Sequence, residues 1–221
     1  METALVIGSS GGIGHAVTTA LRERGVNVTG LSRRKDGLDV TDETSVKQAL
    51  STLDGPFDLI FVATGALEIN GAEPEKTIKT VTAQAMMDQF LLNTVGPSLV
   101  LKHAVRLLPR RGRSVFAALS ARVGSIGDNR LGGWYSYRTS KAALNQMVHG
   151  AAIELGRTHK ELICVTLHPG TVETAFTAKY ADSHPTVPPH EAADNLLRVL
   201  DGLSVQQTGQ FFDWQGKTIP W

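Results

Sequence analysis

Ala4-Leu5-Val6-Ile7-Gly8-Ser9-Ser10-Gly11-Gly12-Ile13-Gly14 is the stretch of sequence that decides the fold. Its first four residues form a short apolar run, as in a strand buried on both faces of a parallel sheet. A glycine-rich loop follows, and residues 15–24 then show helical periodicity that stops at Gly25. We predict a phosphate-binding loop here, because glycines let the backbone approach an anion and helix N–H groups point at it. The alternative is a glycine-rich turn that binds nothing.

Strand-like and helix-like segments alternate along the rest of the chain. We expect further strands at 26–31, 37–40, 57–62, 114–119, 162–167 and 209–213, and helices at about 41–53, 82–108, 134–158 and 191–203. This alternation predicts a doubly wound α/β fold, with a mostly parallel seven-stranded sheet and helices on both faces. Pro97 should kink the second of these helices. The 221 residues show no internal break, which predicts one domain over 1–221.

Composition excludes several classes of partner and location. A net charge of +1 provides no basic field for nucleic acid or an anionic membrane, and no run is apolar enough for a membrane span. The lone Cys164 rules out an internal disulfide, and no signal peptide precedes the first strand, so we expect a cytoplasmic protein. The histidines are scattered without metal-ligand spacing, which predicts no metal site.

Tyr137 and Lys141 are the first candidates for chemistry. At i and i+4 on a helix they lie on the same face and can converge on one small volume. A fixed ammonium favours the phenolate and lowers the phenol pKa toward the range useful for acid–base catalysis. Ser120 stands at the carboxyl end of a predicted strand, the edge where open α/β sheets bind ligands. Asn93 lies inside the helix at 82–108, beside the expected kink, which is a reasonable place for a functional polar group. The alternative is that its side chain is simply bonded to a nearby carbonyl.

The end of the second predicted strand indicates which dinucleotide would bind. About 20 residues beyond the glycines, an acid accepts from a ribose 2′-hydroxyl, whereas an arginine accommodates a 2′-phosphate. Arg33 and Arg34 occupy this place, which favours NADP(H). Asp36 is close enough to be a rival acceptor for the ribose, so NAD(H) stays the alternative. A solvated basic turn is the other interpretation.

The motifs together resemble the short-chain dehydrogenase/reductase family over nearly the whole chain. The glycine loop, Asn93, Ser120, Tyr137-x-x-x-Lys141 and Pro169-Gly170-x-Val172-x-Thr174 have the order and spacing of that family. The chain's short length and its ending, Phe211 to Trp221, are similar to the subgroup of the C-factor signalling protein and small carbonyl reductases. The resemblance implies a Rossmann fold and an NADP-dependent carbonyl reductase or alcohol dehydrogenase that acts on a small molecule. A cofactor-binding signalling protein with little turnover is the alternative.

The resemblance also implies a role for each residue that matches a motif. Tyr137 would be the acid or base, Lys141 would tune it and bond the nicotinamide ribose, and Ser120 would hold the substrate oxygen. Asn93 would position a water next to Lys141. Cofactor contacts are implied for Gly8, Ser10, Gly12, Ile13, Gly14, Asp39, Val40, Ala63, Gly65, Pro169, Gly170, Val172 and Thr174, beside Arg33 and Arg34.

The sequence departs from the family at several places. Val62-Ala63-Thr64-Gly65 stands where the family often has Asn-Asn-Ala-Gly, so backbone contacts there could survive but side-chain bonds cannot be assumed. Ser120 lies 17 residues before Tyr137, an unusually long gap, and Ser125 at 12 residues is the fallback. Loops at 66–81 and 122–134 and a lid at 175–190 should set substrate choice. We expect a homodimer or homotetramer assembled through the helices at 82–108 and 134–158.

Overall fold

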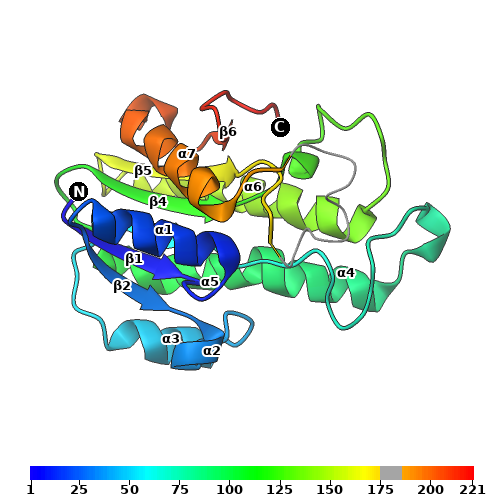
Figure 1. Ribbon diagram of the computed structural model, residues 1–221, viewed down its shortest axis with the longest axis horizontal. Helices are drawn as coiled ribbons and strands as arrows, with labels where there is room; N and C mark the ends of the chain where they lie inside the picture. Colours follow the sequence, from blue (N-terminus) through cyan, green and yellow to red (C-terminus); the bar gives the residue numbers. More distant parts are fainter. Residues whose placement is uncertain (175–185) are drawn as a thin grey trace.

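A six-stranded parallel sheet forms the centre of the protein in the computed structural model, which describes residues 1–174 and 186–221 (Figure 1). The strands follow the order β2-β1-β3-β4-β5-β6, and every neighbouring pair is parallel. Their bounds are β1 Thr3–Ile7, β2 Asn27–Leu31, β3 Leu59–Val62, β4 Ser114–Leu119, β5 Leu162–His168 and β6 Phe211–Asp213. From β1 the chain adds β2 on one side, and from β3 it adds β4, β5 and β6 on the other side, so the winding direction reverses between β1 and β3. The predicted doubly wound fold is therefore confirmed.

Helices cover both faces of this sheet. They are α1 (Gly12–Glu23), α2 (Arg33–Asp36), α3 (Glu43–Ser51), α4 (Ala83–Phe90), α5 (Gly96–Ala104), α6 (Tyr135–Leu155) and α7 (Pro189–Gly202). Short 3₁₀ turns lie at η1 Ile78–Thr80, η3 Val105–Leu107, η4 Arg122–Gly124 and η6 Val205–Gln207. Ala4 and Val6 join one core cluster, which α1 and α7 complete, whereas Leu5 and Ile7 join the cluster under α3, α5 and α6. Alternate residues of β1 are therefore buried on opposite faces, which explains its continuous apolar run.

The predicted strand at 37–40 is wrong, and the described residues hold six strands in place of the expected seven. Leu38 and Val40 are buried, 2% and 5% exposed, but they pack into a core cluster without pairing to a strand. Backbone bonds in this segment close turns, such as the bond from the Leu38 N–H to the Ser32 carbonyl at 3.3 Å. The apolar alternation correctly indicated burial, and the error was to equate burial with strand pairing.

The long helix expected at 82–108 is present as a succession of different turns. α4 passes into one π-helical turn (Leu91–Val95), then into α5 and η3. Pro97 has no N–H to donate to the Asn93 carbonyl, so a regular α turn cannot be completed there. The irregularity therefore lies at Asn93, one turn before the proline that causes it.

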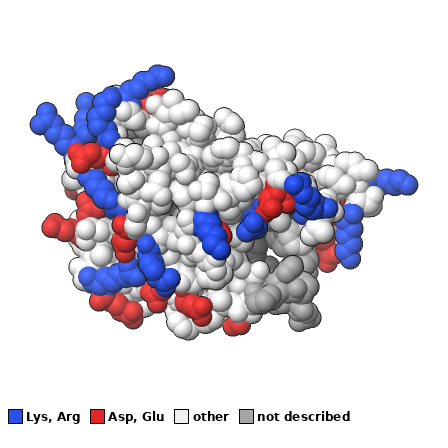
Figure 2. All heavy atoms as spheres, turned by 90° about the horizontal axis from the view of Figure 1, so that it is seen from above, with Lys and Arg blue, Asp and Glu red and all other residues white. Residues whose placement is uncertain are grey.

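Two further expectations concern membranes and the lid. Among the described residues, no helix combines the length and apolar character that a bilayer crossing requires. The lid expected at 175–190 lies outside the described residues except for 186–190, where Val187 bridges to Val172 and α7 begins. In Figure 2, acidic and basic side chains lie next to one another toward the two sides of the face, and a broad area between them carries few charges.

Candidate active site

A cleft of about 350 Å³ opens at the carboxyl ends of β1, β3, β4 and β5. This is the edge at which open α/β sheets bind ligands. Eleven of the residues singled out from the sequence line it, namely Gly12, Ile13, Ala63, Gly65, Ser120, Tyr137, Lys141, Pro169, Gly170, Val172 and Thr174. The fold therefore brings together segments that are more than 150 residues apart in the chain.

The glycine loop forms the floor of the cleft at the start of α1. Gly14 lies so close to the loop that a Cβ on it would overlap the carbonyl oxygen of Gly8, so only glycine fits there. A Cβ on Gly12 would lie 2.6 Å from a Thr174 methyl group, which places the two motifs against each other. The N-cap of α1 is Gly11, which has no side chain to cap the helix, and the first turn contains no acid. Its N–H groups and dipole are therefore available to an anion.

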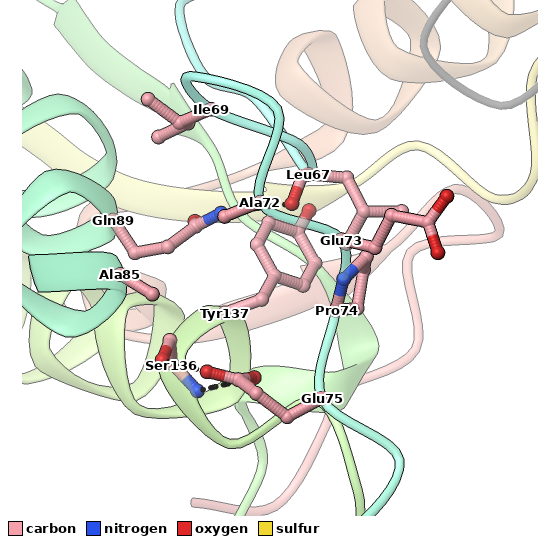
Figure 3. Close-up of a pocket in the computed structure, with 10 residues that line it drawn as sticks. All are labelled: Leu67, Ile69, Ala72, Glu73, Pro74, Glu75, Ala85, Gln89, Ser136 and Tyr137. Carbon is pink, nitrogen blue, oxygen red and sulfur yellow. Dashed lines mark hydrogen bonds between the residues drawn. The ribbon is translucent and has the colours of Figure 1, made fainter. Parts of the chain in front are cut away.

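Tyr137 and Lys141 project from the first two turns of α6 into the other end of the cleft. Both are buried, at 6% and 3% exposed, and the Lys141 Nζ lies 5.9 Å from the centroid of the Tyr137 ring. Lys141 Nζ donates to the carbonyl of Leu119 at the end of β4, 2.9 Å away. Figure 3 shows the other side of Tyr137, where its ring lies between α4 and the loop that contains Pro74.

Burial dominates the acid–base properties of this pair. Removal from water raises the pKa of Tyr137 above its ordinary value and lowers the pKa of Lys141 to about 7. Each change disfavours the charged form of its group. The lowered pKa that we expected Lys141 to give Tyr137 is not found in the protein alone, where burial raises that pKa. A neutral phenol beside a neutral or half-protonated amine is the state at neutral pH.

The two candidate serines have different surroundings. The hydroxyl of Ser120 is buried, lines the cleft and has no hydrogen-bond partner among residues 1–174 and 186–221. Ser125 Oγ donates to the carbonyl of Pro220 and accepts from the N–H of Asp128 at 3.1 Å. A buried hydroxyl without a partner is costly unless a ligand completes it, whereas Ser125 is already committed to the C-terminal segment.

Asn93 does not line the cleft, although it contributes to its wall. It is fully buried, and its Nδ2 and Oδ1 bond both backbone groups of Ala66, at 2.9 and 3.0 Å. Its Nδ2 also donates to Oε1 of Gln89 at 2.5 Å. A Cβ on Gly65 would lie 2.8 Å from Asn93 Oδ1 and 3.2 Å from Lys141 Nζ. Asn93 therefore holds the chain after β3 against the catalytic candidates.

The remaining expected cofactor residues, Gly8, Ser10, Gly14, Arg33, Arg34, Asp39 and Val40, do not line this cleft. Arg33 and Arg34 begin α2, directly after β2, and both are exposed. Asp36 Oδ2 accepts from the N–H of Ser32 at 2.7 Å and from its hydroxyl at 3.1 Å. That carboxylate oxygen therefore caps the turn, which weakens the case for Asp36 as the ribose acceptor. Arg33 and Arg34 are then the better candidates for contact with the cofactor at this place.

Asp39 is committed in a similar way. Its Oδ1 accepts from the hydroxyl and the N–H of Thr41, and these bonds lower the pKa of Asp39. Val40 packs under the start of α5, where a Cβ on Gly96 would lie 2.9 Å from its side chain.

Two polar residues of the cleft were not singled out from the sequence. The hydroxyl of Thr64 and Nδ1 of His168 are buried and, like the hydroxyl of Ser120, have no hydrogen-bond partner in the part of the chain that the structure describes. Burial lowers the pKa of His168 to about 4, so its imidazole is neutral at pH 7. These three polar atoms stand at the ends of β3, β4 and β5, and together they suit a ligand with several polar groups. Their position directly after predicted strands was the available signal.

Comparison with known proteins agrees with this geometry. The family model for short chain dehydrogenases matches residues 2–185. The 1-hydroxy-2-glutathionyl-2-methyl-3-butene dehydrogenase of Rhodococcus sp. (strain AD45) is 30% identical, with 100% of both chains covered. C-signal of Myxococcus xanthus is 36% identical over 62% of this chain and 78% of its own. A short-chain dehydrogenase/reductase from Burkholderia multivorans, solved with bound NADP, is 25% identical, has a TM-score of 0.81 and is covered over 99% of its length and 100% of this chain.

Proposed function

The chain belongs to the short-chain dehydrogenase family, and we propose that it is an NADP-dependent oxidoreductase that interconverts a carbonyl compound and an alcohol. The observation that carries this proposal is the convergence of Tyr137, Lys141 and Ser120 on the cleft that the glycine loop completes. The Rhodococcus relative is named as the dehydrogenase of a hydroxy compound, which supports the reaction class.

Cofactor binding is assigned to the open N-terminus of α1 and to α2. The uncapped N–H groups after Gly11 would hold the pyrophosphate, and Pro169, Gly170, Val172 and Thr174 would line the nicotinamide end. Arg33 and Arg34 would bind the 2′-phosphate, since a fixed guanidinium matches phosphate geometry. The NADP bound to the Burkholderia protein supports this choice. When bound, NADPH supplies the hydride.

Tyr137 is proposed as the general acid of reduction. Its phenol donates a proton to the carbonyl oxygen, and the hydroxyl of Ser120 donates a hydrogen bond to the same oxygen. Because burial raises the pKa of Tyr137, the phenol keeps its proton until the oxygen gains charge, and an alkoxide is basic enough to take it. Protonated Lys141 would then stabilise the phenolate that remains, because a negative charge beside the amine favours its charged form. Oxidation of an alcohol would reverse these transfers.

The test is consumption of NADPH by the purified protein with a panel of aldehydes, ketones and quinones. We expect turnover with NADPH, weaker turnover with NADH, and a loss of about 10²–10⁴-fold in kcat for Tyr137→Phe. Tyr135→Phe is the matched control, because Tyr135 lies on the same helix turn but does not line the cleft. Equal kcat values for the wild type and Tyr137→Phe would refute the assignment.

A signalling function is the second candidate, and the relative named C-signal is the observation that favours it. In that case nucleotide occupancy would alter a surface for partners, and Tyr137→Phe would change neither binding nor signalling. Tight NADPH binding without turnover on any carbonyl compound would favour this candidate over the enzyme.

We also propose that the protein forms a homodimer or homotetramer through α4–α5 and α6. Met87, Leu91 and Val95 are 57%, 41% and 39% exposed and recur every four residues, so they form one apolar stripe along α4 and the π turn. Light scattering after size-exclusion chromatography should give a multiple of the 23.7 kDa chain mass, and Leu91→Glu should reduce it. A wild-type monomer would refute the proposal. The single, buried Cys164 supports a cytoplasmic location.

A further inference from the structure

The helix that carries Tyr137 begins in an unusual way. Its N-cap is Trp134, which adopts a left-handed conformation (φ 51°) and offers no side-chain acceptor. Helix N-termini are normally capped by a Ser, Thr, Asp or Asn at this position, because the first N–H groups have no partner within the helix. Here an acceptor for the Ser136 N–H comes from Glu75, which lies 61 positions before Ser136 in the chain.

Glu75 bonds the start of α6 at three points. Its carbonyl accepts from the N–H of Trp134 at 2.5 Å, and its carboxylate accepts from the N–H of Ser136 at 3.2 Å and from the Ser136 hydroxyl. Glu75 is only 6% exposed, so these bonds are shielded from competition by water. Figure 3 shows the carboxylate at the foot of α6, next to Ser136 and below the Tyr137 ring.

The residues bonded by Glu75 flank the proposed acid. Ser136 precedes Tyr137, and the Trp134 ring packs edge-on against the Tyr137 ring with centroids 6.3 Å apart. The space between Tyr137 and the loop that contains Glu75 is about 10 Å³, too small for a substrate. This loop is therefore the wall behind the phenol, whereas the 350 Å³ cleft is where a substrate enters.

We propose that Glu75 is a positioning residue for Tyr137: it fastens the loop of residues 66–81 to the first turn of α6 and so fixes the phenol at the cleft. The inference rests on the proposed function, in which Tyr137 transfers the proton. Gln89 holds the start of the same loop, since its Nε2 donates to the carbonyl of Leu67 at 2.8 Å. Because the loop is bonded to α6 through Glu75, a small movement of the loop would carry Tyr137 with it.

The test compares Glu75→Ala with Glu75→Gln, which keeps an oxygen acceptor for the Ser136 N–H. A misplacement of about 1 Å costs roughly 10²-fold in rate, so we expect Glu75→Ala to lose about 10²-fold in kcat. Its affinity for NADPH should stay within about twofold, because Glu75 does not line the cofactor cleft. Glu75→Gln should recover most of the lost kcat. Glu161→Ala is the matched control, since Glu161 also accepts from a backbone N–H, that of Gly112 at 2.9 Å, outside the cleft.

A second readout does not depend on turnover. Protein labelled with 3-fluorotyrosine contains three tyrosines, and Tyr137→Phe identifies the resonance of Tyr137. We expect this resonance to broaden or split in Glu75→Ala and to stay single in Glu75→Gln and Glu161→Ala. If Glu75→Ala does not fold, Ser136→Ala, which removes only the hydroxyl bond, replaces it in both assays.

The outcomes separate the two proposals. An unchanged Tyr137 resonance in Glu75→Ala, or a kcat equal to that of the wild type, overturns the positioning role. A parallel loss of kcat and NADPH affinity also overturns it, because that pattern indicates general damage. If the wild type reduces no carbonyl compound, the proposed function fails, and the positioning role is then decided by the fluorine resonance alone.

Discussion

Replacing Lys141 by Met should make the stability of the protein less dependent on pH. Lys141 is 3% exposed, and burial lowers its pKa from 10.5 to about 7. A methionine has a similar length but carries no ionisable group. The change therefore removes a titration while keeping most of the packing of the side chain, although it also removes the bond from Nζ to the Leu119 carbonyl.

The sign and the size follow from proton linkage. Between pH 7 and pH 10.5 the unfolded chain keeps the Lys141 proton while the folded protein loses it, so stability rises with pH. Integrating this difference, the wild type should gain about 2 kcal/mol between pH 7 and pH 9 from Lys141 alone. Cys164 acts in the opposite direction near pH 9, because burial raises its folded pKa from 9.0 to about 12 and the unfolded thiol loses its proton first; this contribution is common to the wild type and the variant and cancels in their difference.

Urea unfolding of the wild type and Lys141→Met at pH 7, 8 and 9 measures this difference. All other groups titrate alike in the two proteins, so the gap between their free energies of unfolding isolates Lys141. We expect the wild type to gain on the variant by about 2 kcal/mol over this range. Parallel pH dependences in the two proteins would refute the reasoning and show that Lys141 stays protonated in the folded state.

Three other predictions concern the cleft and the proposed cofactor site. Gly65→Ala should destabilise the protein by about 1–3 kcal/mol and reduce kcat, because φ is 150° at this position and the new Cβ would lie 2.8 Å from Asn93 Oδ1. Thermal unfolding and turnover measure these two effects, and an unchanged Tm would contradict the prediction. The free energy of unfolding of the wild type should fall by about 2 kcal/mol between pH 7 and pH 4.5, because the pKa of His168 is about 4 in the folded protein and 6.5 in the unfolded chain, which therefore binds more protons. His168→Gln should not show this fall. Urea unfolding of both proteins at the two pH values measures it, and equal losses of stability would contradict the prediction. The double variant Arg33→Ala, Arg34→Ala should raise KM for NADPH at least about tenfold and leave KM for NADH nearly unchanged, because an Arg–phosphate bond is charge-assisted; an equal change for both cofactors would contradict the 2′-phosphate assignment.

The sequence predicted the elements whose signal is local. The buried strands β1, β3, β4 and β5 are short apolar runs, and the helix bearing Tyr137 and Lys141 has a sustained period. Local signals also located the cleft, because the carboxyl ends of parallel strands share one edge. Leu38 and Val40 show the limit of such signals: an apolar alternation reports burial, and only the positions of neighbouring chains decide whether a strand forms.

The serine that faces the cleft illustrates a different limit. The number of residues before Tyr137 did not decide between Ser120 and Ser125 as the serine that faces the cleft, because an intervening loop can accommodate the extra residues. The structure separates them through a contact with the end of the chain, the bond from Ser125 to the Pro220 carbonyl. No local pattern links residue 125 to residue 220, so this distinction required the fold.

The acid–base chemistry required the fold for a related reason. From the sequence, Lys141 is an ammonium one turn from a phenol, and Coulomb attraction alone predicts a lowered pKa for Tyr137. Desolvation depends on what surrounds the pair, and here β4, η4 and the loop after β3 bury both groups almost completely. The two effects have opposite signs, and the balance shifts whenever a bound ligand changes the local charge or excludes more water. Under the proposed function, a site arranged in this way would hold its proton until a substrate oxygen develops charge, which is the property that a general acid for carbonyl reduction needs.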